Sequence, residues 1–242
     1  MKIKTILGCP ALEVTSLKPL KKYILDLVQS KKGGYSVAIN AEKIMMYRNN
    51  IQMKESIDNS ILPSPDGIAV VIAYRWLYST KTIRVDLPNT ILELADQHKL
   101  RLFILGAKED INAQAAHNIK SKFPNINICG RQNGYFNDLE KVKEQLKKAD
   151  PDFVFVCLGS PKQEIIMKEL YKDLQSCIFI GCGGALDVMS GKVKRAPMFY
   201  QKYGLEWFYR IMQRPSLVKR KWVYVPFMLL LIFHTLKKSV LK

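Results

Sequence analysis

Short runs of almost continuous apolar residues alternate with longer amphipathic stretches along most of this chain of 242 residues. A strand that is apolar at nearly every position has to be covered on both faces, which is the situation in a parallel sheet. The stretches between the runs place apolar residues three or four positions apart, as at Leu87, Ile91 and Leu94, which predicts covering helices. The sequence therefore predicts a Rossmann-like α/β fold, a mostly parallel sheet with helices on both faces. The candidate strands are residues 35–39, 101–106, 126–129, 153–159 and 177–181.

Four polar or glycine-containing segments each follow directly after a candidate strand. In an open α/β sheet, ligands bind beyond the carboxyl ends of the strands, so these segments could converge on one crevice. Two of them, LGSPKQE and IGCGGALD, break from an apolar run into a turn and continue as a helix. Such turns present backbone N–H groups to phosphorylated ligands, which makes a nucleotide or sugar phosphate the first candidate. The four segments are residues 40–43, 65–67, 159–164 and 181–187.

Positive charge is concentrated at the C-terminal end. The net charge is +17, and from Lys192 onward there are 12 basic residues against one acidic residue, which favours polyanionic partners. The apolar run at 223–233 is interrupted by Pro226 and is about half of the ~20 residues that span a bilayer. We expect an α/β catalytic domain over 1–197 and, over 198–242, a basic helical appendage at an anionic membrane surface. The alternatives are a helix packed on the body or on a second subunit of a homo-oligomer, and a transmembrane span.

The cysteines and histidines do not have the spacing of a disulfide framework or a metal site. The five cysteines are odd in number and lie mostly within apolar runs such as VFVCLG, which indicates buried thiols in a reducing cytosol. The three histidines are scattered, so we expect no metal site. We also expect no cofactor. The N-terminal stretch MKIKTILGCPAL has too little apolar length for a secretory signal, because a turn is expected at Gly8. These features predict a cytoplasmic protein.

Five short motifs occur in the order and at the spacing of one enzyme family. Together they resemble the WecG/TagA/CpsF glycosyltransferases, glycosyltransferase family 26. The resemblance extends from about residue 5 to residue 222, and five ordered motifs argue strongly against a chance match. The motifs are NAEK at 40–43, PDG at 65–67, GSPKQE at 159–164, GGALDVMSGKVKRAP at 183–197 and GLEWFYR at 204–210.

The resemblance implies a bacterial, metal-independent, inverting transferase. Members of the family take a sugar from a UDP donor, often N-acetylmannosamine or its uronic acid. They add it to a saccharide that is linked through diphosphate to undecaprenyl lipid, and their products enter wall teichoic acid, enterobacterial common antigen or capsule. The family also has an arginine-rich C-terminal appendage that holds the enzyme on the inner face of the cell membrane and completes the active site. The basic tail of this chain is similar to that appendage.

Asp66, in the sequence PSPDG, is the candidate catalytic base. An inverting transfer needs a base that takes the proton from the acceptor hydroxyl as it attacks the anomeric carbon. Gly67 allows the chain to turn here, so that the carboxylate could face the crevice. A PDG sequence alone is more typical of an ordinary turn, and only its position in the family pattern assigns Asp66 to catalysis.

The other candidate residues divide by charge. Backbone N–H groups at 181–185 and basic side chains could bind the diphosphate, since the planar guanidinium of arginine pairs with two phosphate oxygens. An acidic residue would instead bind ribose, uracil or a sugar hydroxyl, or lie in the first turn of a helix. Neutral amides could read the donor hydroxyl or acetamido groups. The donor-binding candidates are Asn40, Arg84, Gln163, Gly181, Gly183, Gly184 and Asp187, and the diphosphate or acceptor candidates are Lys192, Lys194, Arg195, Arg210 and Arg214.

Several positions depart from the family pattern. Ala38 stands where the family commonly has threonine, and Ala69 stands where it usually has glycine. The family sequence RVTGTD is shortened to RVD at 84–86, and HGY is replaced by NGY at 133–135. The departures bear on the donor sugar rather than on the transferase class.

Other classes of function fit parts of the sequence. A non-catalytic UDP-sugar-binding scaffold of a polysaccharide assembly complex would keep the fold, although the intact PDG and GSPKQE motifs argue against it. A nucleic-acid-binding protein would share the pI of 9.6 and the basic, aromatic tail, and its binding would depend strongly on salt. Dinucleotide-dependent redox chemistry is excluded, because GCGG at 181–184 lacks the third glycine of the GxGxxG motif.

Overall fold

The computed structural model describes residues 1–202, 209, 212 and 222–240, and it confirms the predicted α/β class. One six-stranded sheet has the order β4-β3-β8-β7-β5-β6, and all of its neighbouring strands are parallel. Each of the five candidate strands contributes to this sheet. The strands are β3 (Gly34–Ile39), β4 (Leu62–Pro65), β5 (Arg101–Gly106), β6 (Asn127–Gln132), β7 (Phe153–Cys157) and β8 (Ile178–Gly181).

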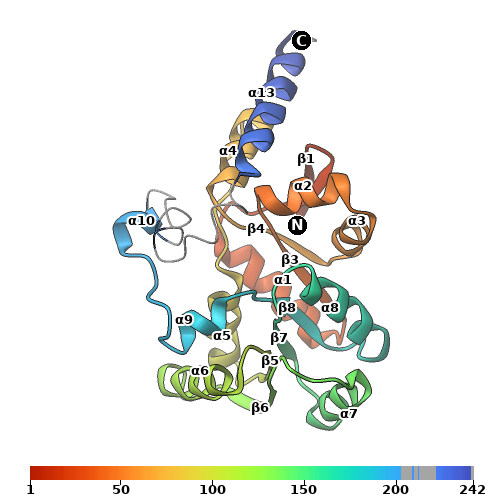
Figure 1. Cartoon of the computed structure of the whole chain (residues 1–242), viewed down its shortest axis with the longest axis vertical. Coiled ribbons are helices and arrows are strands. Elements are labelled where there is room, and N and C mark those ends of the chain that lie inside the picture. Colours follow the sequence, from red (N-terminus) through yellow and green to blue (C-terminus); the bar gives the residue numbers. More distant parts are fainter. Residues whose placement is uncertain (203–208, 210–211, 213–221, 241–242) are drawn as a thin grey trace.

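Helices cover both faces of the sheet, as predicted (Figure 1). The helices of the first face are α2 (Ala41–Asn49), α3 (Ile51–Asp58), α4 (Ile68–Tyr78), α7 (Leu139–Ala149), α8 (Lys162–Asp173) and α13 (Tyr224–Val240). The helices of the second face are α1 (Leu17–Gln29), α5 (Leu87–Gln97), α6 (Glu109–Lys122) and α9 (Ala185–Met189). A short helix, α10 (Met198–Lys202), follows α9 along the chain.

The sheet has one hydrophobic core on each face, because alternate side chains of a strand point to opposite sides. In β5, Phe103 and Leu105 belong to the first core, whereas Leu102 and Ile104 belong to the second. All four side chains are buried. Strands that supply both cores have to be apolar at every position, which explains the continuous runs in the sequence.

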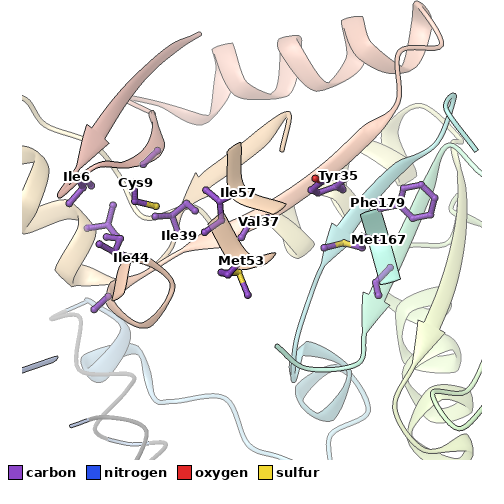
Figure 2. Packing of buried hydrophobic residues seen from close by; sticks show 14 of the residues in the cluster. Ile6, Cys9, Tyr35, Val37, Ile39, Ile44, Met53, Ile57, Met167 and Phe179 are labelled. Carbon is purple, nitrogen blue, oxygen red and sulfur yellow. The ribbon is translucent and has the colours of Figure 1, made fainter. Parts of the chain in front are cut away.

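An antiparallel hairpin precedes the parallel sheet, and the sequence pattern did not predict it. Leu7 and Gly8 form its turn with positive φ angles of 51° and 91°. Ile6 and Cys9 flank this turn, are fully buried and pack in the first core near Ile39 (Figure 2). Lysine alternates with apolar residues in the largely exposed β1 (KIKTI), and β2 (CPALE) contains Pro10 and Glu13. Neither strand is a continuous apolar run, so the hairpin becomes recognisable only through its packing. Its strands are β1 (Lys2–Ile6) and β2 (Cys9–Glu13).

The last helix, α13, packs on α2 and α4 and extends away from the body beside α4 (Figure 1). It buries Phe227 and Leu231 in the first core. Among the described residues, no helix is both long enough and apolar enough to cross a membrane. The division of the chain at residue 197 stays a prediction. The large apolar side chains that α13 leaves exposed are Val225, Leu229, Ile232, Phe233 and Leu236.

Two tyrosines of α4 donate hydrogen bonds to the hairpin. The bond of Tyr74 is buried, whereas the bond of the partly buried Tyr78 is exposed to solvent. The Tyr74 hydroxyl donates to the Ala11 carbonyl at 2.6 Å, and the Tyr78 hydroxyl donates to the Thr5 carbonyl at 2.6 Å. We predict that Tyr74→Phe lowers the free energy of unfolding by about 1–3 kcal/mol, because it leaves a buried carbonyl without this donor. Tyr78→Phe is the matched control and should cost less than about 1 kcal/mol, because water can replace the lost donor. Urea denaturation measures both values, and equal losses would contradict the role of burial.

Candidate functional site

A cavity of about 530 Å³ lies where β3, β4 and β8 end. It is on the second face of the sheet, and α5, α6 and α9 supply its other walls. This is the position at which an open α/β sheet binds its ligands. Five of the residues that the sequence singled out line the cavity, although they come from distant parts of the chain. They are Asn40, Asp66, Arg84, Gly181 and Arg195.

Asp66 is the acidic residue at the end of β4. Its backbone N–H donates to the Ile39 carbonyl at 2.7 Å, which keeps the turn attached to β3. Gly67 follows with φ of 90°, a conformation that side-chain-bearing residues rarely adopt, and α4 begins at the next residue. This turn places Asp66 at the cavity wall with its side chain only partly exposed. The position fits a general base, and the catalytic role stays a prediction.

Asn40 forms the N-cap of α2. Its Oδ1 atom accepts a hydrogen bond from the Lys43 backbone N–H at 3.0 Å, which satisfies one of the free N–H groups of the first turn. Because Oδ1 is used in this way, the Nδ2 group is the part of the amide that can donate to a ligand. Asn40 therefore offers the cavity a neutral donor in an orientation that the helix fixes.

Two arginines bring positive charge to the cavity. Arg84 lies in the extended segment before α5, and the next residue, Val85, donates its N–H to the Pro65 carbonyl at 2.9 Å. This bond holds the segment beside β4 and Asp66. Arg195 forms an ion pair with Asp86, with 2.6 Å between Nη2 and Oδ2, and both side chains are about two-fifths exposed. Solvent-exposed pairs contribute little stability, so this one can exchange partners at small cost.

The loop between β8 and α9 uses most of its N–H groups within the protein. We expected the N–H groups of residues 181–185 to face a diphosphate, but four of these five groups already have acceptors. In this loop conformation a diphosphate would have to be bound mainly by side chains rather than by backbone N–H groups. Gly181 donates to Ser36 Oγ at 3.2 Å, Cys182 to the Val156 carbonyl at 2.9 Å, Gly183 to Gln163 Oε1 at 3.0 Å and Ala185 to the Cys182 carbonyl at 3.1 Å.

Several candidate residues do not line the cavity. Gln163 is 5% exposed and lies behind the cavity wall, where its side chain bonds to the protein. Asp187 lies within α9, and its backbone carbonyl accepts from the Val193 N–H at 2.9 Å. Arg210 and Arg214 lie outside the residues that the structure describes. The candidates that are described but do not contribute to the cavity wall are Gln163, Gly183, Gly184, Asp187, Lys192 and Lys194.

The cavity also contains residues that the sequence analysis missed. Asp86 both pairs with Arg195 and caps α5, accepting from the Asn89 N–H at 3.3 Å. The side chains of α6 add an apolar wall with one cation, Lys122. No sequence motif identifies the residues of α6, because they reach the cavity only through helix packing. The α6 residues in the wall are Asn118, Ile119 and Lys122, and Phe123, the residue directly after the helix, also lines it.

Tyr224, the first residue of α13, is a further part of the cavity wall that the sequence did not reveal. Burial, followed by the nearby charges of Asp66 and Glu42, raises the pKa of Tyr224 to about 12. The phenol therefore keeps its proton at neutral pH and can donate a hydrogen bond. The C-terminal helix thus contributes directly to the surroundings of Asp66.

Comparison with protein families agrees with this arrangement. The model of the "Glycosyl transferase WecG/TagA/CpsF family" matches residues 4–240, which is nearly the whole chain. The match includes every segment that lines the cavity, from Ser36 of β3 to Tyr224 of α13. The chain therefore belongs to the WecG/TagA/CpsF family of glycosyltransferases.

Proposed function

We propose that this glycosyltransferase moves a sugar, of the N-acetylmannosamine type or a related hexose, from a UDP donor to a saccharide linked to undecaprenyl diphosphate. The reaction would serve synthesis of a bacterial surface polysaccharide or teichoic acid. The observation that supports it best is the meeting of the Asp66 carboxylate with two arginines, Arg84 and Arg195, at the same cavity. A carboxylate can remove a proton, and guanidinium groups can bind a diphosphate.

The chemistry is an inverting displacement. Asp66 takes the proton from an acceptor hydroxyl while the hydroxyl oxygen forms a bond to the anomeric carbon. The bond between that carbon and the diphosphate oxygen breaks on the opposite side, and its electron pair leaves with UDP. Arginine side chains, and not a metal ion, meet the charge on the leaving group. Asn40 donates from Nδ2 to a hydroxyl or acetamido oxygen of the donor sugar.

We predict that Asp66→Asn lowers kcat by about 10²- to 10⁴-fold, since general base catalysis contributes that much. UDP binding should change little, because asparagine keeps the size of the side chain. Single-turnover kinetics and calorimetry measure the two quantities. Asp26→Asn, an exposed substitution on α1, is the control and should leave both unchanged. Near-normal turnover in Asp66→Asn would remove this residue from the base role.

We predict that the Asp86–Arg195 pair competes with the diphosphate. Asp86→Asn should tighten UDP binding by about two- to fivefold, because Arg195 no longer has to break a solvent-exposed ion pair to bind the diphosphate. Asparagine can still cap α5. Arg195→Ala should weaken UDP binding by about 10- to 100-fold, since it removes a charge-assisted hydrogen bond. Calorimetric titration with UDP measures both. Weaker binding in Asp86→Asn would show instead that Asp86 supports the nucleotide site.

We also propose that the protein is peripheral on the inner face of the cell membrane, bound through α13. Its exposed apolar side chains would enter the lipid interface, and basic residues of the tail would face anionic headgroups. We predict that Leu229→Gln with Phe233→Gln weakens flotation with phosphatidylglycerol vesicles by at least tenfold, since each buried apolar side chain contributes about 1.5–3 kcal/mol. Phe227 and Leu231 stay intact, so α13 remains docked and turnover of a water-soluble acceptor should persist. Unchanged vesicle binding would place the membrane contact elsewhere.

A further inference from the structure

A buried ion pair lies directly behind the cavity, and neither the sequence motifs nor the proposed mechanism gives it a role. Lys43 Nζ and Glu164 Oε1 are 2.6 Å apart, and their side chains are only 6% and 1% exposed. The two residues are 121 positions apart in the chain. Lys43 also donates to Ser160 Oγ, so the lysine joins α2 to the turn that precedes α8.

The pair continues into a hydrogen-bonded chain. Gln163 Nε2 donates to Glu164 Oε1 at 3.0 Å, and Gln163 Oε1 accepts from the Gly183 N–H at 3.0 Å. We call Lys43, Glu164, Gln163 and the Gly183 N–H group the buried bridge. It connects the first turn of α2 with the loop after β8.

The ionised carboxylate gives this chain a direction. The carboxylate can only accept hydrogen bonds and the Gly183 N–H can only donate. The two together require the amide of Gln163 to present Nε2 to Glu164 and Oε1 to Gly183. A pair of apolar side chains of the same volume would avoid the cost of desolvating two charges, but it could not orient an amide. Orientation, rather than stability, is therefore what the charges contribute at this position.

The buried bridge also connects two walls of the cavity. Asn40, three residues before Lys43, caps the same helix turn and lines the cavity. Gly181, at the end of the neighbouring strand β8, also lines the cavity, and a Cβ atom at this position would lie 2.9 Å from Gln163 Nε2. Gln163 thus packs directly against the backbone of the wall and holds Gly183 by a hydrogen bond. A change in the bridge should move these walls relative to each other.

We propose that Lys43 and Glu164 are positioning residues that act by orienting Gln163. They fix the loop after β8, which supplies Gly181 and Cys182 to the cavity wall, relative to Asn40. They do not line the cavity and would not touch the substrate. The expected effect on UDP binding rests on the proposed function, whereas the expected effect on the position of the loop after β8 does not.

The test is a double-mutant cycle with Lys43→Met, Glu164→Gln and both together. Each single variant leaves one buried group without its partner, so we expect its melting temperature to fall by roughly 10 °C. The double variant removes both charges and should recover most of this loss. Its amide at position 164 can donate as well as accept, so Gln163 Nε2 no longer faces a group that can only accept, and one of the two constraints on Gln163 is lost. In the double variant we therefore expect amide hydrogen exchange at Gly183 to be at least tenfold faster than in the unaltered protein. We expect the UDP dissociation constant to be about tenfold higher than in the unaltered protein.

The control is an exposed ion pair that joins α8, the helix of Glu164, to α3. Lys168 of α8 pairs with Glu55 of α3 at 2.8 Å, and Lys168→Met with Glu55→Gln should change neither the exchange nor the binding. A Lys43/Glu164 double variant with wild-type exchange at Gly183 would overturn the proposal, because the bridge would then serve stability alone. If the unaltered protein does not bind UDP, the proposed function fails, and the exchange measurement still decides the role of the bridge.

Discussion

Burial of the parallel sheet on both faces is the constraint on which the rest of this structure depends. Parallel strands need long crossovers, and the crossover helices cover both faces with apolar side chains. All strands then end at the same edge of the sheet. Residues as distant as Asn40, Asp66 and Gly181 meet there at one cavity. The turns after β3, β4 and β8 bring these three residues together, whereas Arg84, Arg195 and Tyr224 reach the cavity from segments outside the sheet.

Two ion pairs of equal length illustrate how burial determines what a charge does. The Lys43–Glu164 and Arg195–Asp86 pairs both have 2.6 Å between their charged atoms. The first is buried behind the cavity wall, where its loss would leave an uncompensated charge, and it suits a permanent structural role. The second is open to solvent at the cavity, where water and a ligand can replace either partner. We therefore propose that the first pair holds the protein structure in place and that the second pair opens when a ligand binds.

The sequence predicted those features that depend on local pattern. Continuous apolar runs identified the central strands, and the turn after β4 indicated that Asp66 could reach the crevice. The β1–β2 hairpin was missed because its strands, KIKTI and CPALE, carry lysines, a proline and a glutamate among their apolar residues and form no continuous apolar run. The loop after β8 has a glycine pattern typical of phosphate binding, yet its N–H groups bond to Ser36, Val156 and Gln163, which only tertiary packing places there. Tyr224 likewise reaches Asp66 only because α13 docks on α2 and α4.

A crystal structure of the protein with a UDP-N-acetylhexosamine tests the central claim most directly. We expect the diphosphate at Arg195, with the Arg195–Asp86 ion pair broken. We also expect the Asp66 carboxylate on the side of the anomeric carbon opposite the diphosphate, as an inverting displacement requires. A nucleotide bound outside this cavity, or a carboxylate on the same side as the leaving group, would contradict the account.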